Sequence, residues 1–257
     1  MIQMENNSLT VRGLNVKIEG EHILKNVNVS FPSRRITCIV GPSGCGKSTL
    51  LRCLNRLTET IDKVEISGSI LIGGQDLIQA RDAELLELRR RVGLVPQRPC
   101  PLPMSIFDNV AYGCRIHGMH RNKTEMAETV ERYLTEVGLW DEVKDRLKKP
   151  AAHLSLGQQQ RLCLARSLAV EPEFILADEA TSALDPVSSK TVEDLFVRLK
   201  ENYTIIMVTH TLRQALRIAD NAVFLYMGEV IESGEASRVF RDPAEELTRN
   251  YLAGVFS

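Results

Sequence analysis

Nine consecutive residues decide the fold of this chain: Gly41, Pro42, Ser43, Gly44, Cys45, Gly46, Lys47, Ser48 and Thr49. They fit the phosphate-loop pattern G-x-x-x-x-G-K-[ST] at every constrained position. The glycines let the backbone turn sharply and direct consecutive N–H groups at phosphate oxygens. The Lys47 ammonium can then reach the terminal phosphates, and the Ser48 hydroxyl can bind Mg²⁺. The pattern therefore predicts a site for a nucleoside triphosphate and its magnesium ion.

The residues on either side of the loop support this prediction. Residues 36–40 form a short apolar run that predicts a buried strand, and residues 50–54 are typical of a helix. This arrangement directs the N-terminus of a helix at the bound anion.

Length and composition exclude several classes of protein. The chain has 257 residues, of which 44% are hydrophobic and 25% charged, enough to bury a sizeable core. Lys and Arg number 32 against 33 Asp and Glu, without a long basic tract, so we expect no nucleic-acid partner. The basic triplet at 89–91 is interpreted as the solvated end of an acidic helix. No apolar stretch approaches the ~20 residues that cross a bilayer, and no signal-peptide pattern opens the chain. We expect a cytosolic or peripheral protein.

The six cysteines are scattered without a C-x-x-C pair, which predicts reduced thiols and neither zinc nor a disulfide framework. Cys45 lies inside the phosphate loop, where a helix N-terminus and Lys47 could lower its pKa. We favour the interpretation that it is simply a small residue that fits the loop.

The rest of the chain alternates strands and helices. Alternating apolar residues before position 31 predict an antiparallel hairpin, and further strands are predicted at 68–74, 92–95, 174–177, 204–208 and 223–226. Such alternation indicates a mainly parallel sheet covered on both faces. Residues 98–154 differ, because prolines are followed by Met126, Val130, Leu134 and Val137 at helical spacing. We expect one domain over 1–257, with a core from 1–97 and 155–257 and a helical subdomain over about 98–154.

Two carboxylates follow the apolar run at 174–177. Asp178 and Glu179 therefore lie at the carboxyl edge of a buried strand, where ligands bind in open α/β sheets. Asp178 is placed to hold Mg²⁺ or its water near Ser48. Glu179 is then free to orient or deprotonate an attacking water.

The stretch Leu154-Ser155-Leu156-Gly157-Gln158-Gln159-Gln160-Arg161 opens another predicted helix. Ser155 is a good N-cap, and Gly157 leaves a backbone N–H uncovered for a phosphate. The stretch resembles the L-S-G-G-Q signature of ABC ATPases. The resemblance extends to Gln97 as the Q-loop glutamine, to residues 182–185 as the D-loop, and to His210 as the switch histidine. Six motifs in the order of that family cover nearly the whole chain.

The resemblance implies a P-loop NTPase of the ABC type with a RecA-like core, using ATP and Mg²⁺. Two copies of the chain would pair head to tail, so that ATP on the phosphate loop of one copy is covered by the signature of the other. The nucleotide-covering residues would be Ser155, Gly157, Gln158 and Asp185. The catalytic residues would be Glu179, His210, Gln97 and Lys47, and the metal ligands would be Ser48, Gln97 and Asp178. Gln97 would also couple the site to the helical insertion, which carries the groove for a membrane partner.

Residues 41–56, 101–113, 158–163 and 251–256 are similar to the ATP-binding subunit of bacterial phosphate importers. This resemblance implies two integral-membrane permease subunits and, indirectly, a periplasmic phosphate-binding protein, at the cytoplasmic face of the inner membrane. It also implies a possible phosphate-signalling regulator as a partner. Two alternatives stay open: an importer ATPase for another solute, and a soluble non-transport ABC ATPase of the iron–sulfur assembly or translation type.

Two positions depart from the family pattern. Residue 156 is Leu where Gly is usual, and no aromatic residue precedes Phe31 to stack on adenine. Stacking of a base on an aromatic ring is worth roughly 1–3 kcal/mol. We therefore expect weaker or less base-selective nucleotide binding.

Overall fold

Two β-sheets form the framework of the protein. The computed structural model describes residues 8–120 and 122–255, so Phe256 of the C-terminal motif lies outside the described residues. The strands are β1 (Leu9–Ile18), β2 (Glu21–Phe31), β3 (Ile36–Val40), β4 (Val64–Ile72), β5 (Gln75–Asp76), β6 (Val92–Val95), β7 (Phe174–Asp178), β8 (Thr204–Val208), β9 (Asn221–Tyr226) and β10 (Glu229–Glu235).

The larger sheet has the order β10-β9-β3-β8-β7-β6. All neighbouring pairs from β9 to β6 are parallel, and β10 adds an antiparallel edge strand. The predicted mainly parallel core sheet is therefore confirmed.

The smaller sheet is antiparallel and has the order β2-β1-β4-β5. Its β1–β2 pair is the predicted hairpin. The strand predicted at 68–74 begins earlier, at Val64, because residues 64–67 continue the pairing with β1.

Ten α-helices and three short 3₁₀ helices are formed within the described residues. The α-helices are α1 (Lys47–Cys53), α2 (Asp82–Arg90), α3 (Ile106–Ile116), α4 (Lys123–Glu136), α5 (Trp140–Val143), α6 (Leu156–Leu168), α7 (Pro186–Leu199), α8 (Leu212–Ile218), α9 (Ala236–Arg241) and α10 (Glu246–Leu252). The 3₁₀ helices are η1 (Leu57–Thr60), η2 (Lys144–Arg146) and η3 (Ala151–His153).

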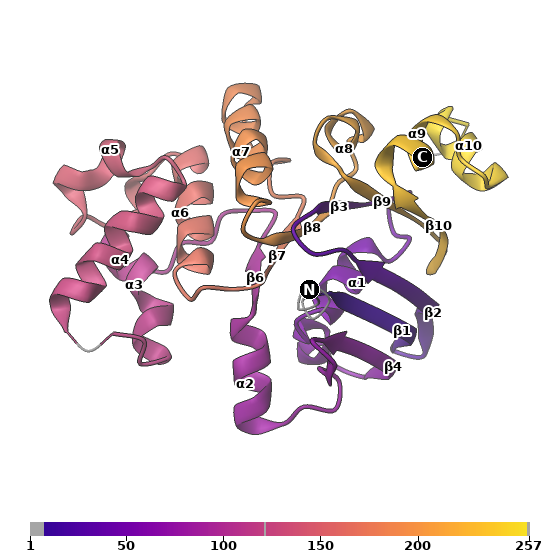
Figure 1. Cartoon of the computed structure of the whole chain (residues 1–257), viewed down its shortest axis with the longest axis horizontal. Helices are drawn as coiled ribbons and strands as arrows, with labels where there is room; N and C mark the ends of the chain where they lie inside the picture. The colour runs from indigo at the N-terminus through magenta and orange to yellow at the C-terminus, as the bar shows by residue number, and fades with distance from the viewer. Residues whose placement is uncertain (1–7, 121, 256–257) are drawn as a thin grey trace, which may run out of the picture.

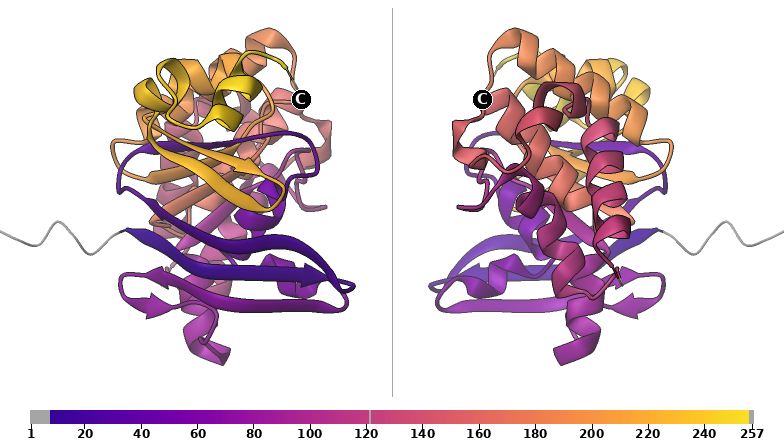
Figure 2. Two further views of the ribbon diagram at one scale, coloured as in Figure 1. Left: turned by 90° about the vertical axis from the view of Figure 1, so that its right-hand side faces the viewer. Right: turned by 90° about the vertical axis from the view of Figure 1, so that its left-hand side faces the viewer.

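Helices cover one face of the larger sheet, and α1 with the antiparallel sheet covers the other (Figures 1 and 2). In β3, Ile36, Cys38 and Val40 join the core formed with α3, α4, α6, α7 and α8, whereas Ile39 joins the core formed with α1 and the antiparallel sheet. Successive side chains of a strand point to opposite faces. Each buried aliphatic side chain contributes about 1.5–3 kcal/mol, so packing on both faces stabilises the sheet.

Helices α3, α4 and α5 all lie within residues 98–154, at the left of Figure 1. Val130, Leu134 and Val137 of the predicted apolar stripe are buried, and Met126 is partly buried against the same core. Ser105 caps the N-terminus of α3 by accepting the Asp108 N–H, which favours the start of the helix at this position.

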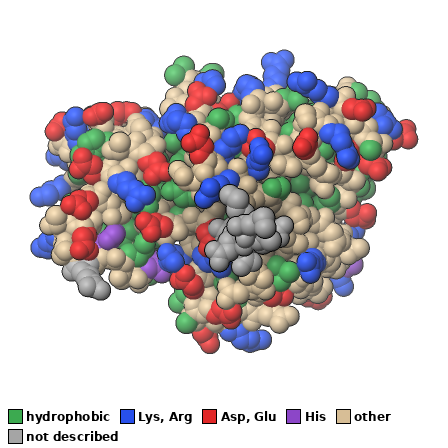
Figure 3. Space-filling model, in the orientation of Figure 1, with side chains coloured by type: hydrophobic (Ala, Val, Ile, Leu, Met, Phe, Trp, Pro, Cys, Tyr) green, Lys and Arg blue, Asp and Glu red, His purple; other side chains and the backbone are tan. Residues whose placement is uncertain are grey.

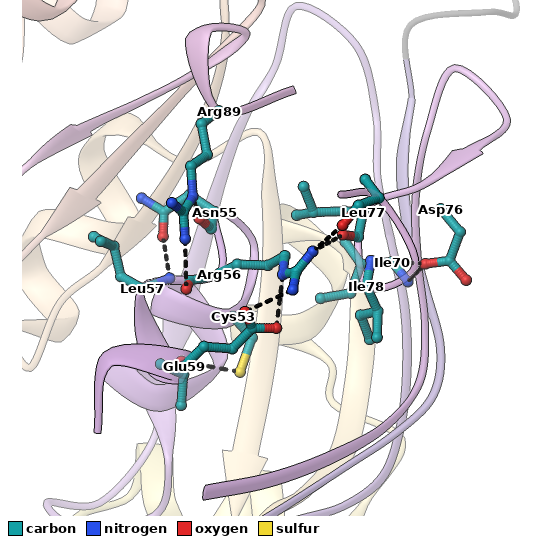
Figure 4. A network of polar contacts seen from close by, with 12 residues as sticks. Cys53, Asn55, Arg56, Leu57, Glu59, Ile70, Asp76, Leu77, Ile78 and Arg89 are labelled. Atoms are coloured by element: carbon teal, nitrogen blue, oxygen red, sulfur yellow. Dashed lines mark hydrogen bonds and ion pairs between the residues drawn. The ribbon is translucent and has the colours of Figure 1, made fainter. Parts of the chain in front are cut away.

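A network around Arg56 joins the phosphate-loop helix to the antiparallel sheet (Figure 4). The Arg56 guanidinium donates to the carbonyl oxygens of Leu77 at 3.1 Å and Ala80 at 2.5 Å, and it pairs with Glu59. Arg89 of α2 donates to the carbonyl of Arg56 at 3.2 Å. The end of α1 is thereby tied to the β5–α2 connection.

The interpretation of residues 89–91 as a solvated helix end needs correction. Helix α2 does end there, but all three guanidinium groups are bonded. Arg89 holds the carbonyls after α1, Arg90 pairs with Glu87 and the carbonyl of Val170, and Arg91 forms a two-point pair with Glu173. These arginines connect elements that lie far apart in the sequence.

The face seen in Figure 3 carries Lys and Arg side chains interspersed with Asp and Glu. Among the described helices, none is both long and apolar enough to cross a bilayer.

Gly68 provides a test of the antiparallel sheet. Its φ is +103°, and a Cβ there would lie 2.4 Å from the carbonyl oxygen of Gly13 on β1. Gly68→Ala is expected to lower the free energy of unfolding by about 2 kcal/mol or more. The cost of a positive φ and the cost of the clash between the new Cβ and the backbone of Gly13 add together. Gly20→Ala is the matched control, since Gly20 has a φ of +86° and open space around it. The control should lose only about 1 kcal/mol. Urea denaturation of both variants checks this, and equal losses would refute the clash.

Candidate nucleotide-binding site

Four strands deliver the predicted site residues to one edge of the larger sheet. Strands β3, β8, β7 and β6 run parallel, so their carboxyl ends lie together. The phosphate loop follows β3, Gln97 follows β6, Glu179 follows β7, and His210 follows β8. The prediction that ligands bind at this edge rests on the same geometry.

The phosphate loop begins with a close backbone contact. A Cβ at Gly41 would lie 2.0 Å from the carbonyl oxygen of Leu225 on β9, so only glycine fits. The loop then leads into α1, whose first residue is Lys47.

Lys47 is buried inside the loop, with 7% of its surface exposed. Its Nζ donates to the carbonyl oxygens of Gly41 at 2.8 Å and Pro42 at 2.6 Å. An ammonium group has three donors. Nζ also contacts the Cys45 Sγ at 3.9 Å, and the contact of Lys47 with a phosphate oxygen stays a prediction.

Ser48 and Asp178 lie side by side, since the Ser48 Oγ donates to Asp178 Oδ1 at 2.8 Å. Asp178 is buried, and its Oδ2 lies 3.3 Å from the Arg52 guanidinium. A hydroxyl and a carboxylate are oxygen ligands of the kind that Mg²⁺ prefers. The two groups therefore fit a magnesium ion held with the phosphates of a nucleotide.

Glu179 lies between Gln97 and His210. Its Oε2 accepts from Gln97 Nε2 at 2.9 Å and lies 3.2 Å from His210 Nδ1. Gln97 Nε2 also lies 3.2 Å from Ser182 Oγ, which leaves the amide oxygen of Gln97 to reach a cation. Glu179 has a φ of +47°, a conformation that costs a non-glycine residue of order 1–3 kcal/mol and is concentrated at functional sites.

A hollow of about 390 Å³ lies over the phosphate loop. It is lined by residues of the loop, by Glu179, and by Ile18 and Ile23 of the antiparallel sheet. Ile18 and Ile23 are the hairpin side chains that line this hollow. The hairpin side of the hollow is therefore aliphatic, in keeping with the missing aromatic residue.

Ser155 begins α6 with a capping box. Its Oγ accepts the Gln158 N–H at 3.3 Å, and Gln158 Oε1 accepts the Ser155 N–H at 3.0 Å. The predicted N-cap is therefore confirmed. The side-chain amide of Gln158 also donates to Glu142 at 2.7 Å, so both ends of this amide are used within the chain.

Gly157 also has a packing role, and its predicted backbone contact with a phosphate stays a prediction. A Cβ at this position would lie 2.7 Å from Ser188 Oγ of α7, so the glycine lets two helices approach each other. The first-turn N–H groups of Leu156 and Gly157 have no acceptor within the helix. Leu156, the residue that departs from the family pattern, is 55% exposed and disturbs neither the cap nor the core.

Asp185 lies next to this helix start. It caps α7 by accepting the N–H groups of Val187 and Ser188 at 3.0 Å each, and hydrogen bonds from Ser188 hold its pKa below the usual value. Ser155, Gly157 and Asp185 thus form a second cluster, at the neighbouring N-termini of α6 and α7. Within the described part of the chain, this second cluster contributes no residue to the lining of the hollow around Lys47 and Glu179.

The Cys45 thiol is buried, and burial is the main influence on its pKa, which is raised. Lys47 lowers the pKa by less than burial raises it. The interpretation of Cys45 as a small residue that fits the loop agrees with this environment.

Three residues near the site were missed by sequence reasoning. Arg52 pairs with Asp178, Gln160 donates to the carbonyl of Pro96 at 3.0 Å, and the Tyr251 hydroxyl hydrogen-bonds the backbone of Gly41. A signal existed for Arg52, because it lies four residues after Ser48 on the same helix face. Neither Gln160 nor Tyr251 is close in sequence to its partner, so no local pattern indicates these contacts.

Comparison with known proteins gives a consistent result. The family model for ABC transporters matches residues 24–182, more than half of the chain. The cbiO1 protein from Clostridium perfringens, described as part of the ABC transporter complex cbiONQ, is similar in structure with a TM-score of 0.80 and 29% identity over 96% of each chain. A bacterial Atm1-family ABC exporter with ATP bound has a TM-score of 0.79 and 26% identity, covering 100% of this chain and 43% of the exporter chain.

The role of Glu179 can be tested with Glu179→Gln. The variant keeps the shape of the side chain but cannot accept a proton, so the rate of ATP hydrolysis should fall by about 100-fold or more. ATP affinity, measured with a fluorescent analogue, should change by less than about threefold. Glu201→Gln, the same change at an exposed position, is the control and should leave both unchanged. If Glu179→Gln hydrolyses ATP at a rate within a few-fold of the wild-type rate, Glu179 is not the catalytic carboxylate.

The aliphatic base surface can be tested with Ile18→Tyr. A ring at this position should tighten ATP binding by about fivefold or more, since stacking is worth roughly 1–3 kcal/mol. The wild type should favour ATP over GTP by less than about tenfold, measured by titration with both nucleotides. Leu216→Tyr, which adds the same ring on the exposed face of α8, is the control. Low-micromolar ATP binding by the wild type with strong rejection of GTP would contradict the expectation.

Proposed function

The chain belongs to the ABC transporter family, and on that basis we propose that it is the ATP-hydrolysing subunit of an importer for inorganic phosphate. Membership of the family brings ATP binding and ATP hydrolysis coupled to transport. The imported solute, the direction of transport and the roles of single residues are the steps that we add.

The observation that carries the proposal is the separation of the site into two clusters. The phosphate loop, Asp178, Glu179 and His210 gather at the sheet edge, whereas Ser155, Gly157 and Asp185 gather at the starts of α6 and α7. A helix start is a favourable place for phosphate. Two copies paired head to tail would bring the second cluster of one copy over the phosphate loop of the other.

The surface of the second cluster supports this pairing. Leu156 is 55% exposed and Val187 is 77% exposed, and both lie in the first turns of the two neighbouring helices. In a head-to-tail dimer these apolar side chains would be covered by the partner copy. Closure would be driven by ATP, because a nucleotide held by both clusters binds only the closed form well.

Within each closed site, we assign the chemistry to the residues around Glu179. The Glu179 carboxylate would take the proton of the attacking water, and His210 beside it would contact the γ-phosphate and orient that water. Lys47 would hold the terminal phosphates. Ser48, Gln97 and Asp178 would hold Mg²⁺, which neutralises charge on the phosphates when it is bound.

The helical region over residues 98–154 would transmit closure to two integral-membrane permease subunits. Tyr112 is 39% exposed and Ile116 is 63% exposed on α3, which gives this region apolar surface for a partner. Gln97, immediately before this region, contacts Glu179, and Gln160 of α6 holds the neighbouring carbonyl of Pro96. The protein would therefore act as a peripheral homodimer at the cytoplasmic face of the inner membrane.

Phosphate as the solute rests on the resemblance of residues 41–56, 101–113 and 158–163 to phosphate-importer subunits. The ATPase does not touch the solute, which would be selected by the permeases and a periplasmic binding protein. Arg56, in the first of these segments, supports the structure by tying α1 to the β5–α2 connection. The test has three competing outcomes. The chain could energise export, it could energise import of another solute, or it could act outside transport as a soluble ATPase.

Uptake of labelled phosphate tests the proposal. Cells that lack this chain and their other phosphate carriers would be complemented with the wild type, Glu179→Gln or the control Glu201→Gln. We expect uptake with the wild type and the control and a loss of at least about tenfold with Glu179→Gln. An unchanged uptake on deletion, at limiting phosphate, would reject the solute while leaving the ATPase assignment in place. Purification with membrane proteins from detergent extract separates transport of another solute from a non-transport role.

A further inference from the structure

A buried polar network lies directly behind the loops that carry Glu179 and His210. At its centre is Gln214 on α8, which has 5% of its surface exposed. We propose that Gln214 is a positioning residue that links the loop after β7 to the loop after β8 and so holds Glu179 and His210 in register. Its effect on hydrolysis rests on the proposed function, whereas the link itself does not.

The side-chain amide of Gln214 reaches both loops. Its Oε1 accepts from the Thr209 hydroxyl at 2.7 Å, and its Nε2 donates to the Thr181 hydroxyl at 2.7 Å. Nε2 also lies 3.2 Å from Glu193 Oε1 on α7. An amide nitrogen has two protons, so both donors of Gln214 are used.

Glu193 decides which way the amide of Gln214 faces. A carboxylate can only accept hydrogen bonds, so the Nε2 side of the amide must face it. Glu193 is 3% exposed and is held by the Arg217 guanidinium, which contacts both carboxylate oxygens at 2.8 Å. A carboxylate this deeply buried needs such a partner. The orientation of the link is therefore set by an ion pair outside the catalytic edge.

One end of the link shapes the turn at His210. The Thr209 hydroxyl that donates to Gln214 also accepts the N–H of Thr211 at 3.0 Å. The residues on both sides of His210 are thus tied to one hydroxyl group. Thr209 is 2% exposed, so water cannot readily replace these bonds.

The other end of the link holds the loop that begins with Glu179. Thr181, which is 8% exposed, lies between Glu179 and Ser182. Its carbonyl oxygen accepts from Ser189 of α7 at 3.2 Å, and Ser182 Oγ lies 3.2 Å from Gln97 Nε2. Thr181, Ser182, His210 and Gln214 line one hollow of about 350 Å³. The two ends therefore meet at the 3.2 Å contact between Glu179 and His210.

Gln214→Met tests the link, because methionine has a similar length but no hydrogen-bonding amide. We expect kcat for ATP hydrolysis to fall at least tenfold, while affinity for a fluorescent ATP analogue changes less than threefold. Amide hydrogen exchange should rise in both loops, at 179–182 and at 208–211. Exchange is measured on the full chain and requires no turnover.

A second pair of variants separates a specific link from general damage. Thr209→Val removes the hydroxyl at one end and should lower kcat as Gln214→Met does. Thr209→Ser keeps the hydroxyl and should have a kcat close to that of the wild type. The kcat of the double variant Gln214→Met/Thr209→Val should be no more than about threefold lower than that of either single variant, because both substitutions break the same link. Thr191→Val, which removes an exposed hydroxyl on α7, is the control and should behave as the wild type.

The outcomes distinguish the two proposals. A wild type without ATPase activity would reject the proposed hydrolysis, and the exchange data would still decide the link. Exchange that rises only within α8, or that is unchanged in one of the two loops, would overturn the link. Loss of kcat in Gln214→Met together with an equal loss of nucleotide affinity, or multiplied losses in the double variant, would also overturn it.

Discussion

The parallel hydrogen bonding of β3, β8, β7 and β6 is the constraint on which the site depends. These strands end at one edge, and the functional groups come from the residues that follow each of them. Glu179 can contact Gln97 and His210 only while the register of β7 against both neighbours is kept. That register is maintained by strands buried on both faces, so the core that stabilises the fold also sets the distances within the site.

The buried charged side chains near the site are paired with other groups of the chain. Asp178 is held between Ser48 and Arg52, Lys47 is held by two carbonyl groups, and Glu193 is held by Arg217. Leaving such groups without partners would cost more than each bond contributes. Lys47, Ser48 and Asp178 are therefore held in place by contacts within the chain.

The predicted site residues lie in two separate clusters, and each cluster would have a different role. The first cluster contains the groups that would act on the phosphates, and the second contains helix starts that would bind them. Gly157 shows how the second cluster is built, since its missing side chain lets α6 approach Ser188 of α7. Helix α7 also carries Glu193 of the polar network around Gln214. The surface that would meet a partner and the loops that hold Glu179 and His210 therefore share this supporting helix.

Local sequence determined those features that depend on a few neighbouring residues. The phosphate loop, the strand before Asp178 and Glu179, the cap at Ser155 and the stripe from Val130 to Val137 were all predictable, because each specifies backbone conformation or a buried face within one or two turns. The tertiary structure alone decided the partners of Arg91, Gln160 and Tyr251, the close packing of Gly157 against α7, and the link through Gln214. These contacts join residues on different elements, most of them far apart along the chain. They follow from strand order and helix packing, which no local pattern contains.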